Sequence, residues 1–333
     1  MRLSEVMRPL VIQSFAKLNL TFEILGTLPG GFHQVRTIFH NIDLADTLSF
    51  QLLETNADAS FQVVLSLASA GCDTPSEQAV FPLDDTILIV RAATKFALLN
   101  NCGQGKTLKV AIEKKIPIAA GLAGGSSNAA AALKAMSVLF QVDTELTGAR
   151  EVAAQLGSDI NFCLDGGTKI GSNRGELLTP VEVAQPLTFL LLKPRQIAIS
   201  TPWIYREYDA HLAAASSAEQ LRENNHTEAC LRALSVKNTE ALAGSFFNAF
   251  EPVCFEHFPH VLQLKDAMLK AGCLSANITG SGPTLFGLLS NRQHGLEVKS
   301  RLLSDLSAQP SFDIWIVESS GAGVREAHEN ATF

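Results

Sequence analysis

Residues 115–133 read KIPIAAGLAGGSSNAAAAL, and this stretch decides what fold to expect. It joins a short apolar segment to a glycine-rich loop, two serines and a run of alanines, which are strong helix formers. Gly121, Gly124 and Gly125 let the backbone approach a ligand closely, because glycine has no Cβ atom. The stretch therefore predicts a loop that holds a ligand and a helix that follows it at once.

We expect that helix to run from residue 127 to about 140, with Ser126, Ser127 and Asn128 supplying capping side chains. Its free N–H groups and the positive end of its dipole would face an anion in the loop. The pattern is neither a Walker A loop nor a G-x-G-x-x-G fingerprint. The alternative is a plain glycine turn before a core helix. The double serine and the immediate helix start favour a phosphate-binding loop.

Working outward, apolar alternation and helical periodicity mark the other elements. Strands are expected at residues 11–25 with an interruption at 16–19, and at 61–67, 107–113, 186–192, 283–289 and 312–318. Helices are expected at residues 85–99, 147–156, 210–242 and 259–271. Because strands and helices alternate without a steady βαβ rhythm, the sequence predicts a two-domain α+β fold rather than a doubly wound sheet.

Composition narrows the class of protein. The 333 residues carry a net charge of -7 without a Lys/Arg-rich tract, so we expect neither a nucleic-acid nor a membrane partner. The six cysteines are scattered without a C-x-x-C pair, which favours free thiols over a disulfide framework or a zinc site. No secretory leader or membrane-spanning run is evident, so a cytoplasmic protein is expected.

Two polar motifs flank the loop in sequence. In residues 14–20, SFAKLNL, Lys17 and Asn19 stand two apart and so face the same side of a strand. A lone strand lysine is more often solvent-exposed. In residues 156–166, LGSDINFCLDG, Asp159 follows a glycine and precedes an apolar segment expected to be a strand, so it would project from a loop into a cleft. An ordinary turn or capping aspartate is the alternative.

A second glycine-rich turn, TGSGPTLF, occupies residues 279–286, where a β-turn without a ligand is the alternative. In this order, the four motifs together with GGFH at residues 30–33 and NAFEP at residues 248–252 resemble the GHMP kinase superfamily. Within it they most resemble the family of 4-diphosphocytidyl-2-C-methyl-D-erythritol kinases. The resemblance runs from about residue 13 to about residue 290.

The resemblance implies two α+β domains, residues 1–180 and 181–333, with the active site in the cleft between them. It implies ATP-dependent phosphorylation of the 2-hydroxyl of a small-molecule acceptor, 4-diphosphocytidyl-2-C-methyl-D-erythritol, in the non-mevalonate route to isoprenoid precursors. Asp159 would be the catalytic base and Lys17 its cationic partner. The alternatives are a homoserine or mevalonate-derivative kinase, an ATP-dependent decarboxylase on the same fold, and a non-catalytic binding module.

The resemblance also implies the binding residues. ATP would be held by Lys114, Pro117, Ile118, Ala119, Ala120, Gly121, Leu122, Ala123, Gly124, Gly125, Ser126 and Ser127, with Ser126 or Ser127 near Mg²⁺. The acceptor would be lined by Asn19, Phe32, His33, Thr201 and Tyr205. Phe32 and Tyr205 would sandwich the cytosine ring, with His33 on its edge.

This sequence departs from the family pattern at several positions. The loop has Ala123 in place of a glycine, which is a mild change unless the position needs a positive φ. The other departures are Gly30, Phe32, Thr86, Asn161 and Ala249.

Overall fold

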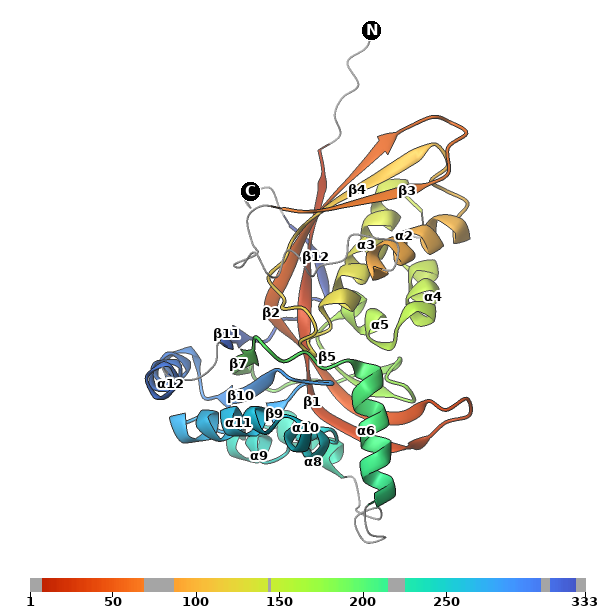
Figure 1. Ribbon diagram of the computed structural model, residues 1–333. Helices are drawn as coiled ribbons and strands as arrows, with labels where there is room; N and C mark the ends of the chain where they lie inside the picture. Colours follow the sequence, from red (N-terminus) through yellow and green to blue (C-terminus); the bar gives the residue numbers. More distant parts are fainter. Residues whose placement is uncertain (1–7, 69–86, 143–144, 215–224, 307–311, 328–333) are drawn as a thin grey trace.

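The computed structural model describes residues 8–68, 87–142, 145–214, 225–306 and 312–327. These residues form two sheets with helices packed on them. A long hairpin, residues 10–54, extends along both the upper and the lower half of the molecule (Figure 1). The mixed helix and strand architecture confirms the predicted α+β class. The domain boundary at residue 180 stays a prediction.

The first sheet has the strand order β12-β1-β2-β4-β3, with β5 and β6 continuing from β2 and with β8 beside β1. Its strands are β1 (Leu10–Thr27), β2 (His33–Glu54), β3 (Gln62–Leu67), β4 (Lys106–Glu113), β5 (Thr168–Ser172), β6 (Leu177–Pro180), β8 (Phe247–Asn248) and β12 (Val324–Glu326). The helices that follow these strands in the first part of the chain are α2 (Leu88–Leu99), α3 (Gly124–Phe140), α4 (Thr147–Leu156) and α5 (Ser158–Asp165).

The second sheet has the order β11-β7-β10-β9. It is built from β7 (Thr188–Pro194), β9 (Asn277–Ile278), β10 (Leu285–Leu289) and β11 (Phe312–Glu318). The accompanying helices are α6 (Thr201–Ala214), α8 (His226–Leu234), α9 (Thr239–Ala243), α10 (Glu251–His257), α11 (Pro259–Ala271) and α12 (Arg292–Asp305).

The apolar run of β7 is buried on both faces of the second sheet. Leu190 and Leu192 pack into a core with α11 and α12, whereas Phe189 and Leu191 pack into a core with residues of β1 and β2. Successive strand residues point to opposite faces, so a strand covered on both sides is apolar throughout. This is why the predicted strand at 186–192 has no alternation.

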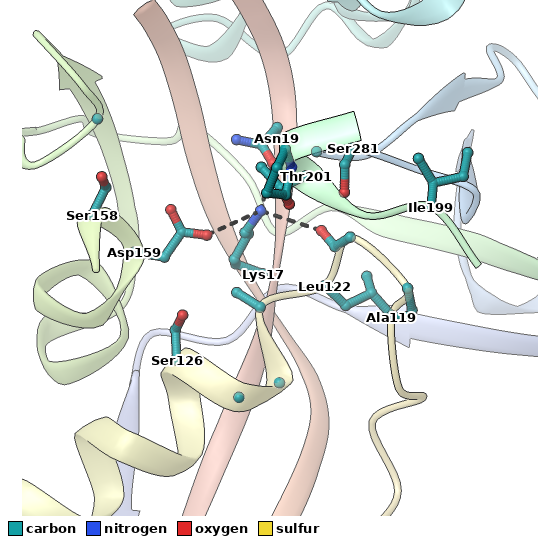
Figure 2. A pocket seen from close by; sticks show the side chains of 18 of the residues that line it. Lys17, Asn19, Ala119, Leu122, Ser126, Ser158, Asp159, Ile199, Thr201 and Ser281 are labelled. Carbon is teal, nitrogen blue, oxygen red and sulfur yellow. Dashed lines mark hydrogen bonds and ion pairs between the residues drawn. The ribbon is translucent and has the colours of Figure 1, made fainter. Parts of the chain in front are cut away.

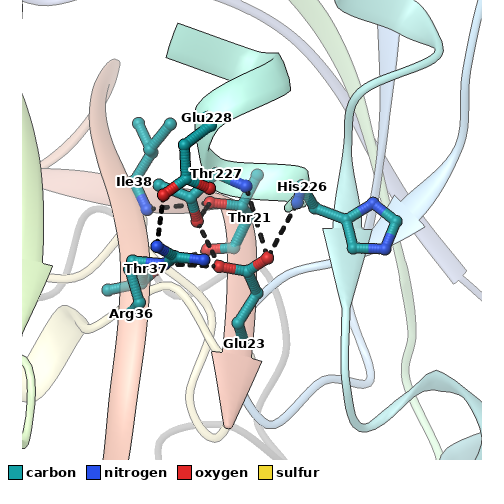
Figure 3. Close-up of polar contacts among 8 residues, drawn as sticks. All are labelled: Thr21, Glu23, Arg36, Thr37, Ile38, His226, Thr227 and Glu228. Atoms are coloured by element: carbon teal, nitrogen blue, oxygen red, sulfur yellow. Dashed lines mark hydrogen bonds and ion pairs between the residues drawn. The ribbon is translucent and has the colours of Figure 1, made fainter. Parts of the chain in front are cut away.

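A buried carboxylate ties β1 to the second half of the chain (Figure 3). Glu23 is 0% exposed, and its Oε1 accepts from the backbone N–H of His226 at 2.8 Å. Its Oε2 accepts from the hydroxyl of Thr227 at 2.7 Å and from Nε of Arg36 at 2.8 Å. Since α8 has no side-chain cap of its own, Glu23 satisfies the first N–H groups of that helix and lies at the positive end of its dipole. The contact fixes α8 against the hairpin.

Several predicted elements are confirmed, among them the strands at 61–67 and 107–113 and the helix at 259–271. Three predictions are wrong. The strand at 11–25 is not interrupted, because β-bulges absorb the irregular register. The loop helix begins at Gly124 rather than at residue 127. The segment after Asp159 is helix α5 rather than a strand.

Parts of other predictions, including Cys72, Thr86 and the first residues of the helix expected at 85–99, lie outside the described residues. Over the ranges that the structure covers, no helix is both long enough and apolar enough to cross a membrane.

His40 on β2 is a buried histidine that is held neutral. Its Nδ1 lies 2.8 Å from the hydroxyl of Thr168 and its Nε2 lies 2.9 Å from that of Ser319, so it joins β2 to β5 and to the segment before β12. Burial lowers the pKa of His40 from its usual 6.5 to about 4, because desolvation penalises the charged ring.

This burial predicts a pH-dependent loss of stability. Below the ordinary imidazole pKa, His40 binds a proton in the unfolded chain but stays unprotonated in the folded chain. The free energy of unfolding therefore falls as pH drops from about 7 to about 4. The shift corresponds to about 3 kcal/mol. In melting curves recorded between pH 7 and 4.5, His40→Gln should flatten this slope. As a control, His260→Gln replaces a partly exposed histidine of α11 and should leave the slope intact. Equal slopes in all three proteins would contradict the prediction.

Candidate active site

Lys17 places a buried positive charge on β1. Its side chain is 4% exposed, and Nζ donates to Oδ1 of Asn19 at 2.6 Å and to the carbonyl oxygen of Gly121 at 3.2 Å. Oδ2 of Asp159 lies 3.5 Å from Nζ, and Figure 2 draws this ion pair. The expectation that Lys17 and Asn19 face the same side is confirmed. The alternative of a solvent-exposed lysine is wrong.

Asp159 lies in the first turn of α5, directly after Ser158. A carboxylate near a helix N-terminus is stabilised by the helix dipole. Its side chain is 31% exposed, so it pairs with Lys17 while still facing the cavity that it lines. The residues after it, including Ile160, Phe162 and Cys163, are buried, which is why this apolar segment looked like a strand in the sequence.

The glycine loop leads into α3 without a side-chain cap. Ala123 is the N-cap residue, and no side chain caps the helix. The predicted capping role of the serines and Asn128 is therefore wrong. Ser127 donates its hydroxyl to the carbonyl oxygen of Phe15 at 2.8 Å, and Oδ1 of Asn128 accepts from the hydroxyl of Ser14 at 2.7 Å. These side chains fasten α3 to β1 and leave the first N–H groups of the helix available to a ligand.

Ala123 has a φ of +57°, in the left-handed region that favours glycine. A non-glycine residue there costs roughly 1–2 kcal/mol. The departure from the family glycine is therefore not mild: the loop keeps the glycine conformation with an alanine in it.

The second glycine turn, TGSG, packs directly against the first. A Cβ atom on Gly121 would lie 2.2 Å from the carbonyl oxygen of Thr279, and Gly121 has a φ of +73°. The hydroxyl of Thr279 accepts from the backbone N–H of Asn19 at 2.9 Å. Asn248, from the NAFEP segment, donates to the carbonyl oxygen of Gly280 at 2.9 Å. The motifs that lie far apart in the sequence thus meet around Lys17.

Lys114 lines the same cavity, but its ammonium group already has partners. Nζ donates to Oδ2 of Asp46 and to the carbonyl oxygen of Ile116, both at 2.6 Å. Oδ1 of Asp46 accepts from the backbone N–H groups of Lys115 and Ile116. Asp46 therefore anchors the chain just before the glycine loop.

Another part of the cavity wall is formed by α6, which contacts His33. The rings of His33 and Tyr205 stack with centroids 4.5 Å apart and an interplanar angle of 26°. Nε2 of His33 lies 2.7 Å from Oδ1 of Asp209. Phe32 is 53% exposed, and the guanidinium of Arg174 lies 4.7 Å from its ring centroid. His33 thus covers one face of Tyr205, and the sandwich of the cytosine ring between Phe32 and Tyr205 stays a prediction.

Tyr205 is largely buried among these groups. Burial raises the pKa of its hydroxyl above the usual value of 10, with smaller contributions from the charges of Asp159 and Asp209. The hydroxyl is therefore a neutral group on the cavity wall at physiological pH.

These groups surround one cavity of about 940 Å³, at the upper end of the usual range for ligand pockets. Of the predicted site residues, its wall contains Lys17, Asn19, Phe32, His33, Lys114, residues 117–126, Asp159, Thr201 and Tyr205. Ser127 is not among them, since it is fully buried behind the loop. The wall also contains Arg174, Arg206 and Asp209, which lie outside the sequence motifs, and Ser158, Gly280 and Ser281, which lie inside them but are not predicted site residues.

Comparison with known proteins identifies the family of this chain. The family model for the GHMP kinase N-terminal domain matches residues 88–167, and the C-terminal model matches residues 219–308. A curated 4-diphosphocytidyl-2-C-methyl-D-erythritol kinase of Gloeobacter violaceus is 31% identical, with 96% of this chain and 97% of the relative covered. A kinase of the same name from Synechococcus sp. (strain JA-3-3Ab) is 35% identical, with 93% of each chain covered. The chain belongs to the GHMP kinases.

Solved structures of GHMP kinases share this fold. A crystal structure of 4-(cytidine 5'-diphospho)-2C-methyl-D-erythritol kinase aligns with a TM-score of 0.72 at 25% identity, covering 94% of this chain and all of the other. A homoserine kinase from Cytophaga hutchinsonii aligns with a TM-score of 0.74 at 15% identity, covering 98% of this chain and 99% of the other. Because kinases with different acceptors share this fold, the fold alone does not distinguish one acceptor from another.

Proposed function

We propose that this kinase transfers the γ-phosphoryl group of ATP to the 2-hydroxyl of 4-diphosphocytidyl-2-C-methyl-D-erythritol. The names of its curated relatives, at 31–35% identity over most of the chain, support this acceptor. The observation that carries the chemistry is the pairing of the buried Lys17 ammonium with the partly exposed Asp159 carboxylate, beside an uncapped helix N-terminus.

Asp159 is the proton acceptor in this proposal. As the acceptor hydroxyl attacks the γ-phosphorus, its proton passes to the Asp159 carboxylate, the new O–P bond forms, and the bond from phosphorus to the leaving oxygen of ADP breaks. Lys17 stabilises the negative charge that develops on the attacking oxygen. Because Lys17 is held by Asn19 and Gly121, it needs no rearrangement to do so.

The glycine loop is the proposed binding site for the ATP phosphates. The first N–H groups of α3, at Gly124, Gly125 and Ser126, have no side-chain cap, and all three residues line the cavity. Backbone donors at a helix N-terminus suit a polyphosphate. In this arrangement Lys114 would stiffen the loop through Asp46 rather than make a strong new contact with the nucleotide.

Mg²⁺ fits the residues present. It prefers oxygen ligands and takes only one or two from the protein when phosphates provide others. The hydroxyl of Ser126 and the carboxylate of Asp159 both line the cavity, whereas the hydroxyl of Ser127 is engaged by Phe15. Of the two serines, we therefore propose Ser126. The bound ion would neutralise phosphate charge.

The acceptor is tested by a screen of the purified protein. ATP consumption should occur with 4-diphosphocytidyl-2-C-methyl-D-erythritol and yield a product phosphorylated at the 2-hydroxyl, detected by phosphorus NMR. Turnover of homoserine or mevalonate instead would reassign the acceptor within the GHMP kinases. Release of carbon dioxide from a mevalonate derivative would indicate a decarboxylase.

Two glycine variants separate loop folding from phosphate binding. A Cβ atom on Gly125 would have no neighbour closer than Leu88 Cδ1 at 3.9 Å, so Gly125→Ala should fold normally and hinder phosphate approach. The KM for ATP should rise about 10-fold or more. Gly121→Ala should lower Tm, because its Cβ atom would collide with Thr279. A Gly125→Ala enzyme with an unchanged KM for ATP would contradict the proposed loop.

A further inference from the structure

Asp209 and Tyr205 hold His33 from two directions. Both residues belong to α6, where positions four apart lie on one face of a helix. Tyr205 stacks on the imidazole and so fixes the plane of the ring. Asp209 lies 2.7 Å from Nε2 and so fixes which edge of the ring points to α6. All three side chains line the cavity.

The contact with Asp209 also decides where the proton of a neutral imidazole lies. An ionised carboxylate can only accept hydrogen bonds, so Nε2 must carry the proton that it donates. Nδ1 is then left with a lone pair and becomes an acceptor. Within the described ranges, the hydrogen bond and ion pair found for the His33 ring both involve Nε2. Nδ1 is therefore the ring atom that can receive a hydrogen bond from a ligand.

We propose that Asp209 is a positioning residue that sets the base specificity of this kinase. By holding His33 in the Nε2–H form, it makes Nδ1 an acceptor for the exocyclic 4-amino group of cytosine. Uracil carries an oxygen at the same position, so two acceptors would face each other. This inference rests on the proposed function, in which the acceptor substrate carries a cytidine diphosphate.

The expected selectivity follows from the asymmetry of hydrogen bonding in a pocket. A matched donor and acceptor gain little free energy over their hydrogen bonds to water. Two buried acceptors that face each other both lose their hydrogen bonds to water and gain none in return. A loss of this kind corresponds to about a 5- to 150-fold preference. The exposed His33–Asp209 contact need not contribute much to folding stability. Its effect is on which atom of the imidazole carries the proton.

The test compares the cytidyl acceptor with its uridyl analogue at about pH 8.5, above the ordinary titration range of imidazole. The wild-type enzyme should favour the cytidyl compound in kcat/KM by about 5- to 150-fold. Asp209→Asn should narrow this preference several-fold, because an amide can donate to Nε2 as well as accept from it. The KM for the cytidyl compound should rise and the KM for the uridyl compound should fall. Asp209→Glu should restore part of the preference.

A matched control comes from the same helix. Glu207 pairs with His257 at 3.5 Å, and neither lines the cavity, so Glu207→Gln should leave the preference unchanged. The ¹⁵N NMR signals of His33 should report the Nε2–H form in the wild type and a mixture in Asp209→Asn. General damage to the fold would not lower the KM for the uridyl compound.

The two possible failures are distinct. If the wild type turns over the cytidyl acceptor and Asp209→Asn keeps the same cytidyl-to-uridyl ratio, the role of Asp209 is overturned. That role is also overturned if His33 shows the Nδ1–H form in the wild type. If the wild type does not phosphorylate the cytidyl acceptor, the proposed function is overturned, and the inference about base specificity is overturned with it.

Discussion

The buried ammonium group of Lys17 is the constraint on which the rest of the site depends. A charge that is 4% exposed is tolerated only where acceptors surround it, since an unpaired buried charge is costly. Its acceptors come from β1, from the glycine loop and from α5, so these three segments must converge. The convergence brings Gly121 against Thr279 with no room for a Cβ atom. The same contacts that satisfy one charge therefore explain why two glycine turns, far apart in the sequence, lie together.

Much of the fold could be predicted because its patterns are local. The strands at 61–67 and 107–113 alternate, and the helix at 259–271 ends at a glycine that adopts a φ of +117°. The segment after Asp159 could not be assigned from periodicity, because a short apolar run fits a buried strand and a buried helix equally well. The expected start of α3 at residue 127 is too late, because glycine is unfavourable in helices and its presence at residues 124 and 125 argues against a helical turn there. Its first turn is held by tertiary contacts of Ser127 and Asn128 instead.

The site residues that can be predicted are those whose chemical type and order along the chain match recognisable motifs. Lys17, Asp159 and residues 117–126 could be selected from motifs, and the structure brings them to one cavity. Asp209 and Arg174 could not be selected, because nothing in their neighbourhood distinguishes them from surface charges. The spacing of Tyr205 and Asp209 is a signal only once α6 is known to be helical and His33 is known to lie against it. The sequence does not show which distant segments are in contact.

The central claim is that Lys17 and Asp159 act as one unit in phosphoryl transfer, and a double-mutant cycle on kcat tests it most directly. Asp159→Asn alone should lower kcat by about 10²–10⁴-fold, and Lys17→Met should also lower it. Because residues that act as a unit are strongly non-additive, the double variant should be little slower than the slower single variant. Substrate binding measured by calorimetry should change much less than kcat. Two effects that multiply in the double variant, or a near wild-type kcat in either single variant, would contradict the account.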